Sequence, residues 1–291
     1  MARIKLPPKP PFKKVGLAGL GLIGGSLAKA LIPFGGLELH IFDRDPATVE
    51  AARRVRRFAA VTDDAETFVG WPLDLAYLCL PVRRNIQLVE LMGRRGAAYP
   101  VTDAGSAKAP IAAAAARAGL VFCGGHPIAG LELSGWANSS ADLIRGCLFI
   151  ITPPDGAGPE VLALAEKLRA LHELLDCRVR FMSPSDHDRL YGLVSHLPYL
   201  AAAALAGTVL RKGGLETLAW AGTGFRDSTR VGASAPPKWV EIILQNADNL
   251  VEDIEALRGL LAEISAGLSA RDEAGLLALL EPIADFRGRK R

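Results

Sequence analysis

The feature that most constrains the fold of this chain is the segment 14–31, KVGLAGLGLIGGSLAKAL. An apolar run leads into Gly19-x-Gly21-x-x-Gly24, and apolar side chains then recur at helical spacing. This order predicts a strand, a tight turn and a helix, as in a dinucleotide-binding βαβ unit. In such a unit Gly19 permits the turn, Gly21 lets a pyrophosphate approach the backbone, and Gly24 allows the helix to pack on the strand. The free N–H groups at the start of the helix then attract phosphate.

A second apolar run, 37–42, ends in Asp43, about 20 residues beyond the last glycine of the motif. At that position a carboxylate can accept hydrogen bonds from the adenosine ribose hydroxyls, which favours NAD. It would repel the 2′-phosphate of NADP, although the neighbouring Arg44 could partly compensate. The alternative role of Asp43 is that of a turn or helix N-cap residue. The predicted cofactor-binding residues are Gly19, Gly21, Leu22, Ile23, Gly24, Asp43 and Arg44.

Length and composition limit the classes of protein to consider. With 291 residues, half of them apolar and 22% charged, the chain can bury a sizeable core and form two domains. The net charge of +3 is small and no basic stripe is interleaved with aromatics, so we predict no nucleic-acid partner. No uninterrupted apolar run reaches the ~20 residues of a membrane span. Residues 1–12 suggest a flexible lead-in rather than a signal peptide. Together these features predict a cytoplasmic protein without membrane contact. The cysteines stand singly, without CxxC spacing, which predicts no metal site.

Beyond Asp43 helical and strand patterns alternate, which predicts a Rossmann-like parallel sheet over residues 13–182. The expected strands after the first two are 58–61, 73–80, 99–103, 120–123, 147–152 and 178–181, and the expected helices are 46–56, 85–94, 111–118 and 159–174. Strand patterns then stop, so residues 183–291 form an expected all-helical domain with helices at 189–210, 238–246, 250–268 and 274–280. Ser183 is expected to cap the N-terminus of a helix. Pro198 is expected to kink the helical stretch 189–210. Helices so rich in Leu and Ala need a partner, which predicts a homodimer.

Two segments at predicted strand ends contain the candidate catalytic residues, because ligands of such sheets bind beyond the carboxyl ends of the strands. They are 103–108, which contains Ser106, and 124–130, which contains His126. A neutral imidazole, with an unperturbed pKa of about 6.5, can accept the proton of an alcohol as hydride leaves its carbon. His126 is therefore the candidate base, and Ser106 could hydrogen-bond the imidazole or the reacting hydroxyl. The alternative is a loop histidine that only satisfies backbone groups.

Five strings occur in order along the chain: GLGLIGGS at 19–26, TDAGSAK at 102–108, GGHPIAG at 124–130, SHLP at 195–198 and GFRDSTR at 224–230. Together they resemble the prephenate/arogenate dehydrogenases of tyrosine biosynthesis, over nearly the whole chain. The resemblance implies a Rossmann domain followed by an all-helical domain that dimerises. It also implies NAD-dependent oxidative decarboxylation, in which hydride leaves ring C4 of a small anionic cyclohexadienyl substrate and carbon dioxide leaves C1. The product would be 4-hydroxyphenylpyruvate from prephenate or tyrosine from arogenate.

The resemblance also implies roles for single residues. His126 would accept the hydrogen bond or proton of the 4-hydroxyl with the help of Ser106, and Arg230 would bind a substrate carboxylate in a bidentate geometry. His196 would lie at the cleft between the domains. The other residues placed near the substrate are Asp227, which could orient basic residues, Tyr199 and Trp239. The alternatives are a helix histidine at His196, core packing of Trp239 and a surface salt bridge at Arg230.

Three positions depart from the pattern of the family. Tyr199 stands where a second histidine is often found, Leu131-Glu132-Leu133 replaces Ser or Thr followed by Glu-Lys, and Thr223 replaces a glycine. These changes leave the choice between prephenate and arogenate open, and a preference for arogenate or for both is compatible with them. Two alternative functions are that of another two-domain Rossmann dehydrogenase, of the 3-hydroxyacid or imine-reducing type, and that of a non-catalytic dinucleotide sensor.

Overall fold

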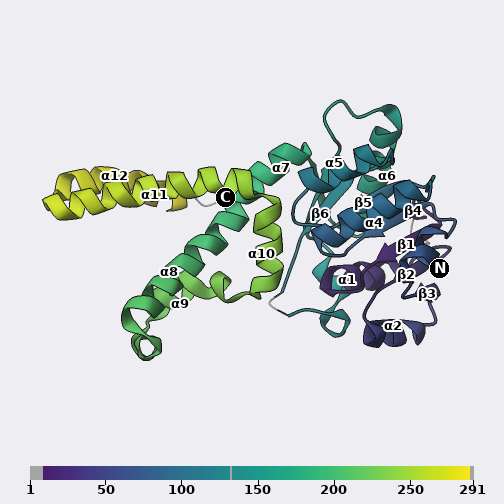
Figure 1. Ribbon diagram of the computed structural model, residues 1–291, viewed down its shortest axis with the longest axis horizontal. Coiled ribbons are helices and arrows are strands. Elements are labelled where there is room, and N and C mark those ends of the chain that lie inside the picture. The colour runs from purple at the N-terminus through teal and green to yellow at the C-terminus, as the bar shows by residue number, and fades with distance from the viewer. Residues whose placement is uncertain (1–8, 132, 289–291) are drawn as a thin grey trace, which may run out of the picture.

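The computed structural model describes residues 9–131 and 133–288, and Figure 1 shows their division into two regions. A Rossmann-like domain, at the right of Figure 1, contains the strands, and α7 (Pro184–Tyr191) leads from it into a helical domain at the left. The predicted fold class is thus confirmed. The predicted lead-in, residues 1–12, falls mostly outside the described residues, and so does the end of the chain, residues 289–291.

The first sheet has five parallel strands in the order β3-β2-β1-β4-β5. The strands are β1 (Lys14–Ala18), β2 (Glu38–Phe42), β3 (Phe58–Thr62), β4 (Leu75–Leu78) and β5 (Val101–Asp103). The helices between them are α1 (Leu22–Leu31), α2 (Pro46–Arg53), α3 (Ala65–Val69) and α4 (Val82–Arg94). The sheet grows outward on one side of β1 and then on the other, so the switch point lies between β1 and β4. Ligands of open α/β sheets bind beyond the carboxyl ends of the strands at such a point.

The central strands are buried on both faces, which explains their almost continuous apolar sequences. On β1, Val15 and Leu17 face one hydrophobic cluster, while Ala18 faces another on the opposite side of the sheet. On β4, Tyr77 and Leu78 divide in the same way between the two clusters. This division follows from the alternation of side chains along a strand. Two cores, one on each side of the sheet, therefore hold the carboxyl ends of β1 and β4 in fixed positions.

After α5 (Ala109–Arg117), a second sheet contains β6 (Gly124–Ile128), β7 (Leu148–Thr152) and β8 (Arg178–Phe181), with α6 (Pro159–Glu173) between the last two. β6 pairs antiparallel with β7, so the expectation of parallel strands throughout is wrong. The strand expected at 120–123 is also wrong, since only a single bridge joins Phe122 to Val101. Gly124 and Gly125 are the first residues of β6, where they pair with Thr152 and Ile151. The close packing requires glycine, because a Cβ would collide with Thr152 at the first position and with the backbone of Asp103 at the second. His126 therefore lies within a strand, not in a loop after one.

A buried ion pair joins the second sheet to the first. The Lys108 ammonium contacts the Asp103 carboxylate and donates a hydrogen bond to the Gly125 carbonyl at 2.7 Å. The same carboxylate accepts the N–H of Gly125 at 3.2 Å. Both charged side chains are fully buried. Because backbone pairing between β5 and the start of β6 is sparse, these contacts fix the strand that carries His126.

The helical domain is built from α8 (Leu197–Gly213), α9 (Thr223–Thr229), α10 (Pro236–Gln245), α11 (Ala247–Ala270) and α12 (Glu273–Gly288). The predicted cap is confirmed, since Ser183 Oγ accepts the N–H of Asp186 at 3.1 Å and α7 begins at Pro184. The expected kink takes the form of a π-helical turn, Gly192–His196, just before Pro198. A proline has no N–H to donate to the preceding turn, which accounts for the irregularity there. In Figure 1, α8 with α9 and α11 with α12 form two arms that diverge away from the Rossmann-like domain.

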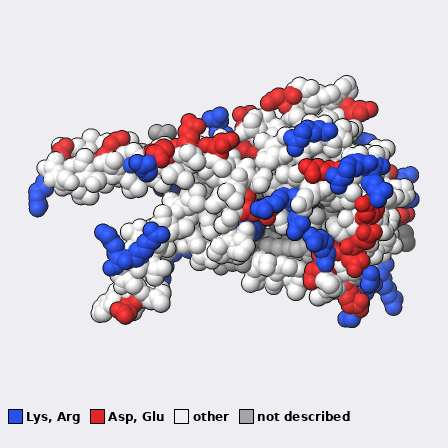
Figure 2. Space-filling model, viewed as in Figure 1, with Lys and Arg blue, Asp and Glu red and all other residues white. Residues whose placement is uncertain are grey.

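The helical arms expose many large apolar side chains in the single chain. Trp220 is 90% exposed, and half or more of the surface of several leucines and of Phe286 is open to solvent. On the face that Figure 2 displays, charged residues lie over the Rossmann-like domain and in separate groups along both arms, with uncharged surface between these groups. The helical stretch Pro184–Gly213 contains an 18-residue window with a mean hydropathy of 1.6, so it is long and apolar enough to cross a membrane by length and composition alone. Its first half nevertheless carries buried, hydrogen-bonded polar side chains, His187, Asp188 and His196, which suit a helix of a folded domain.

Candidate active site

The glycine turn connects β1 to α1. Gly19 has a φ of +93°, a conformation that favours glycine, and its N–H donates to the Phe42 carbonyl at 2.7 Å. A Cβ at Gly24 would overlap with the carbonyl oxygen of Gly19, whereas a Cβ at Gly21 would meet no described atom within 4 Å. No described side chain caps the N-terminus of α1. The N–H groups of its first turn are therefore left for an anion.

The two glycines should respond differently to the same substitution. We expect Gly24→Ala to destabilise the Rossmann-like domain, because the backbone carbonyl that the new methyl group meets cannot move away. We expect Gly21→Ala to leave the melting temperature unchanged but to raise the KM for NAD, because its methyl group would stand where the pyrophosphate approaches. Thermal unfolding and NAD titration of both variants test this, and equal losses of stability would contradict it.

Asp43 holds the glycine turn against the end of β2. Its Oδ2 accepts the N–H of Leu20 at 2.6 Å and its Oδ1 accepts the N–H of Asp45 at 2.9 Å. The N-cap of α2 is Asp45, whose carboxylate accepts the N–H of Thr48 at 3.0 Å, so the N-cap alternative for Asp43 is wrong and its role in the turn is observed. Each carboxylate oxygen of Asp43 keeps further capacity to accept a hydrogen bond, as from a ribose hydroxyl. Arg44 is exposed beside it.

Two cavities meet at the strand ends and share part of their walls. The first, of about 490 Å³, is lined by residues 21–23 of the glycine turn and reaches α10. The second, of about 830 Å³, extends to the helical domain, where Arg230 contributes to its wall. Ser106, His126 and Lys238 line both cavities. The candidate base thus lies where a dinucleotide in the first cavity would meet a substrate in the second.

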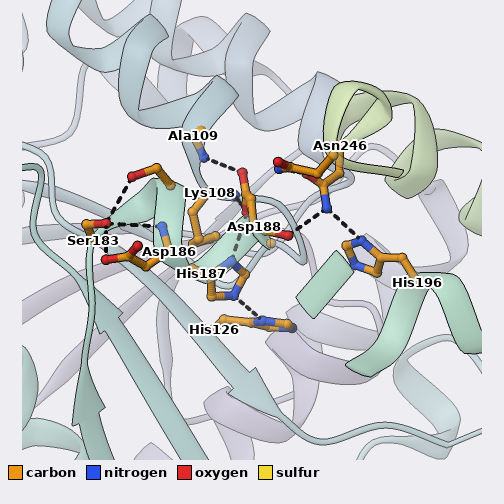
Figure 3. A network of polar contacts seen from close by, with 12 residues as sticks. Lys108, Ala109, His126, Ser183, Asp186, His187, Asp188, His196 and Asn246 are labelled. Atoms are coloured by element: carbon orange, nitrogen blue, oxygen red, sulfur yellow. Dashed lines mark hydrogen bonds and ion pairs between the residues drawn. The ribbon is translucent and has the colours of Figure 1, made fainter. Parts of the chain in front are cut away.

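His126 belongs to a chain of hydrogen bonds, which Figure 3 shows. His126 Nδ1 lies 2.8 Å from His187 Nε2, and His187 Nδ1 lies 2.8 Å from Asp188 Oδ1. Asp188 is anchored in turn by the N–H groups of Lys108 and Ala109, at 2.7 and 2.8 Å. A carboxylate only accepts hydrogen bonds, so His187 donates through Nδ1 and, when neutral, accepts the Nδ1–H of His126. This leaves the lone pair of His126 on Nε2, the nitrogen directed away from His187.

The surroundings of His126 keep its ring neutral. Burial is the largest cause that lowers its pKa well below the ordinary value, followed by His187 and by the charge of Lys108, with smaller contributions from His196 and Lys238. Burial also lowers the pKa of His187, although its contact with Asp188 works in the opposite direction. Near neutral pH the His126 ring is therefore in the form that can accept a proton.

His196, in the π-helical turn, lines the larger cavity. Its Nδ1 lies 3.2 Å from Asn246 Nδ2, which also donates to the carbonyl of Asp188 at 2.8 Å. Because Asn246 Oδ1 accepts a hydrogen bond from Asn249, the Asn246 amide presents its N–H to His196. Burial lowers the pKa of His196 to about 4. The ring is therefore neutral, with its lone pair on Nδ1 and an N–H donor on Nε2.

Only some of the remaining residues that were predicted to lie near the substrate line a cavity. Arg230 and Trp239 line the larger cavity. Tyr199 is buried and stacks on Trp239, with ring centroids 4.1 Å apart and planes 3° apart, so it supports the cavity wall without lining it. Asp227 is exposed on α9 and lines neither cavity in the single chain.

Several residues that build the site were missed by the sequence analysis as functional candidates. His187 ends the segment 183–187, which was interpreted only as a capping signal. It lies 61 residues beyond His126, so no local pattern joined the two. Lys108 belongs to the string TDAGSAK at 102–108, but nothing in that string predicted its buried contact with Asp103. Lys238 and Asn246 gave no signal in the sequence. Among residues 9–131 and 133–288 no group of three or more His, Cys, Asp or Glu side chains could hold a metal ion.

Comparison with known families accounts for most of the chain. Residues 28–179 match the family described as "Prephenate dehydrogenase, nucleotide-binding domain". Residues 183–282 match the family described as "Prephenate dehydrogenase, dimerization domain". The resemblance inferred from the five sequence strings is therefore confirmed.

Individual relatives agree with these matches. The prephenate dehydrogenase of Bacillus subtilis is 28% identical over 281 residues, which cover 93% of this chain and 74% of that protein. The crystal structure of prephenate dehydrogenase from A. aeolicus, in complex with hydroxyphenyl propionate and NAD+, superposes with a TM-score of 0.84 at 30% identity, covering 94% of this chain and 97% of the other. The structure of Synechocystis arogenate dehydrogenase gives a TM-score of 0.78 at 29% identity, with 94% and 98% covered.

Proposed function

This chain belongs to the prephenate dehydrogenase family of oxidoreductases, and we propose that it catalyses the NAD-dependent oxidative decarboxylation of prephenate, arogenate or both. The observation that carries the proposal is the position of His126, between the glycine turn and Arg230, with its Nε2 lone pair fixed by His187 and Asp188. An assembled base of this kind has no use in a non-catalytic dinucleotide sensor. The family match likewise disfavours dehydrogenases of the 3-hydroxyacid and imine-reducing types.

NAD fits the residues around the first cavity. The uncapped start of α1 and the open approach at Gly21 suit a pyrophosphate, and Asp43 can accept hydrogen bonds from a ribose. The carboxylate of Asp43 also favours NAD over NADP, because a second phosphate would be repelled. The bound nicotinamide supplies the acceptor for the hydride. The protein supplies the binding site, the orientation and the base.

The residues of the second cavity perform the acid–base chemistry. The 4-hydroxyl of the substrate donates to His126 Nε2, and Ser106, whose hydroxyl has no hydrogen-bond partner among the described residues, contacts the same oxygen. His126 takes the hydroxyl proton as hydride leaves C4, and Asp188 stabilises the resulting positive charge through His187. The C1–carboxylate bond then breaks, its electrons enter the ring, and the oxygen on C4 regains the proton. Carbon dioxide departs and the ring becomes aromatic, which makes the reaction effectively irreversible.

His187 acts on the reaction through His126, so its replacement tests this arrangement. We expect His187→Phe to lower kcat by about 10-fold or more, a part of the roughly 10²–10⁴-fold that a positioned base contributes. A phenyl ring cannot accept the Nδ1–H of His126, so the tautomer and orientation of the base are no longer fixed. His187→Gln is the matched variant, because its amide oxygen can accept a hydrogen bond from the Nδ1–H of His126. It should retain more activity than His187→Phe. Equal turnover in both variants and the wild type would contradict the assignment.

The pH profile gives a second readout of the same arrangement. Because the pKa of His126 is lowered, the base is deprotonated at neutral pH, and kcat/KM should fall only as the pH drops below about 6.5. We expect the profile of the wild type to be flat from there to neutral pH.

We also propose a homodimer formed through the helical arms. The match to a dimerization domain and the exposed apolar side chains of the arms support this assembly. Light scattering should give the mass of two chains, and the mass of one chain would contradict the proposal. The cytoplasmic location stays a prediction, which cell fractionation would test.

The reaction itself is tested by the initial rate of NADH formation with prephenate and with arogenate, each repeated with NADP. Turnover of either substrate supports the proposed function, and the ratio of kcat/KM for the two nucleotides tests the role of Asp43. Measurable NAD binding without turnover of either substrate would overturn the proposal.

A further inference from the structure

We propose that Lys238 makes the second cavity selective for prephenate over arogenate, by binding the carboxylate and keto oxygen of the pyruvyl side chain and repelling an ammonium group in its place. This inference rests on the proposed function and names the substrate of that same site. The sequence left the choice between prephenate and arogenate open, and one residue of α10, Lys238, would decide it.

Lys238 lies at the junction of the two cavities, and the described part of the chain provides no counter-ion for it. It lines both of them, and it makes no hydrogen bond or ion pair with any residue that the structure describes. The nearby Glu241 is engaged elsewhere, since its Oε1 accepts the N–H of Arg83 at 2.7 Å. No residue in the ranges 9–131 and 133–288 occupies the three donors of the Lys238 ammonium, so they can serve a ligand.

The charges around the second cavity suit a substrate with two carboxylates and no ammonium. Arg230 and Lys238 are the charged side chains among its described lining residues, and both are positive. His126 and His196 are held neutral, and His196 offers an N–H donor rather than an acceptor. An ammonium group beside Lys238 would therefore meet a cation and no carboxylate among the described lining residues of this cavity, which gives a basis for discrimination. Glu132 lies outside the described residues.

Lys238 is also placed to reach the side chain of a substrate whose 4-hydroxyl contacts His126. Both residues line both cavities, and the charge of Lys238 makes a small contribution to lowering the pKa of His126. When the 4-hydroxyl contacts His126, the side chain on C1 lies across the substrate ring. If Arg230 binds one of the two substrate carboxylates, Lys238 is the other described cation that lines the cavity and can bind the second carboxylate.

The first test is Lys238→Met, which keeps the length of the side chain and removes its charge. We expect kcat/KM for prephenate to fall by about 10- to 100-fold, the usual effect of losing a hydrogen bond to a charged group. The value for arogenate should change little, because the lost attraction to its side-chain carboxylate and the lost repulsion of its ammonium group oppose each other. The ratio between the substrates therefore falls by about 10-fold or more. Lys167→Met, an exposed lysine on α6 outside both cavities, is the matched control and should leave both values unchanged.

The second test is a gain of activity, which a misfolded protein cannot produce. Lys238→Glu places a carboxylate where an ammonium would bind, so we expect kcat/KM for arogenate to rise while that for prephenate falls. Equal losses for both substrates in the Met variant, with no gain in the Glu variant, would overturn the proposal. A raised KM for NAD with an unchanged substrate ratio would overturn it as well, because Lys238 would then serve the dinucleotide.

A binding measurement separates this inference from the proposed function. Calorimetry with 4-hydroxyphenylpyruvate and with tyrosine, on the protein loaded with NAD, compares a keto acid and an amino acid without any turnover. Lys238→Met should weaken binding of 4-hydroxyphenylpyruvate by about 10-fold and leave that of tyrosine unchanged. Failure of the wild type to turn over either substrate would reject the proposed function, whereas equal weakening of both ligands would reject the role of Lys238.

Discussion

His126→Asn is expected to lower kcat by roughly 10²–10⁴-fold, the usual contribution of general acid–base catalysis, while NAD binding is retained. The asparagine amide can still donate to His187 Nε2, so the local hydrogen bond survives. It has no basic nitrogen, however, so the proton of the 4-hydroxyl has no acceptor when hydride leaves. The glycine turn is separate from this change, which is why the affinity for NAD should persist.

Steady-state kinetics and an NAD titration of His126→Asn provide the measurement. His40→Asn is the matched control, because His40 lies on β2 and lines neither cavity. The control should turn over normally. Near-normal turnover of His126→Asn would remove His126 from the mechanism and with it the roles given to His187 and Asp188.

Arg230→Ala is expected to cost about 2–5 kcal/mol of substrate affinity, much of it from leaving a substrate carboxylate in the cavity without its partner. The guanidinium can bind a carboxylate through two parallel hydrogen bonds, a geometry that an ammonium cannot reproduce. Arg230→Lys should therefore fall between the wild type and the alanine variant. The loss should appear mainly in the KM for the substrate.

The KM for substrate and for NAD, measured in both Arg230 variants, tests this expectation. Arg211→Ala, an exposed arginine on α8 that lines neither cavity, is the control for the loss of a positive charge. Unchanged KM and kcat in Arg230→Ala would mean that the carboxylate binds elsewhere, with Lys238 as the next candidate.

The amino-acid sequence by itself determined the dinucleotide-binding end of the site and the class of fold. The glycine turn could be predicted because a strand, a tight turn and a helix are specified by residues close together in the chain. Asp43 could be placed for the same reason, since it ends the next strand of the same unit. The alternation of strand and helix patterns, followed by helices alone, likewise follows from local periodicity.

Only the tertiary structure decided how the substrate end of the site is built. Gly124 and Gly125 suggested a loop, but they pair with β7 as the start of the strand that carries His126, and they pack closely against β5. His187, on α7, and Lys238, on α10, reach the same cavities from distant parts of the chain. Contacts of this kind depend on sheet pairing and helix packing between remote segments, and no local pattern of residues encodes them.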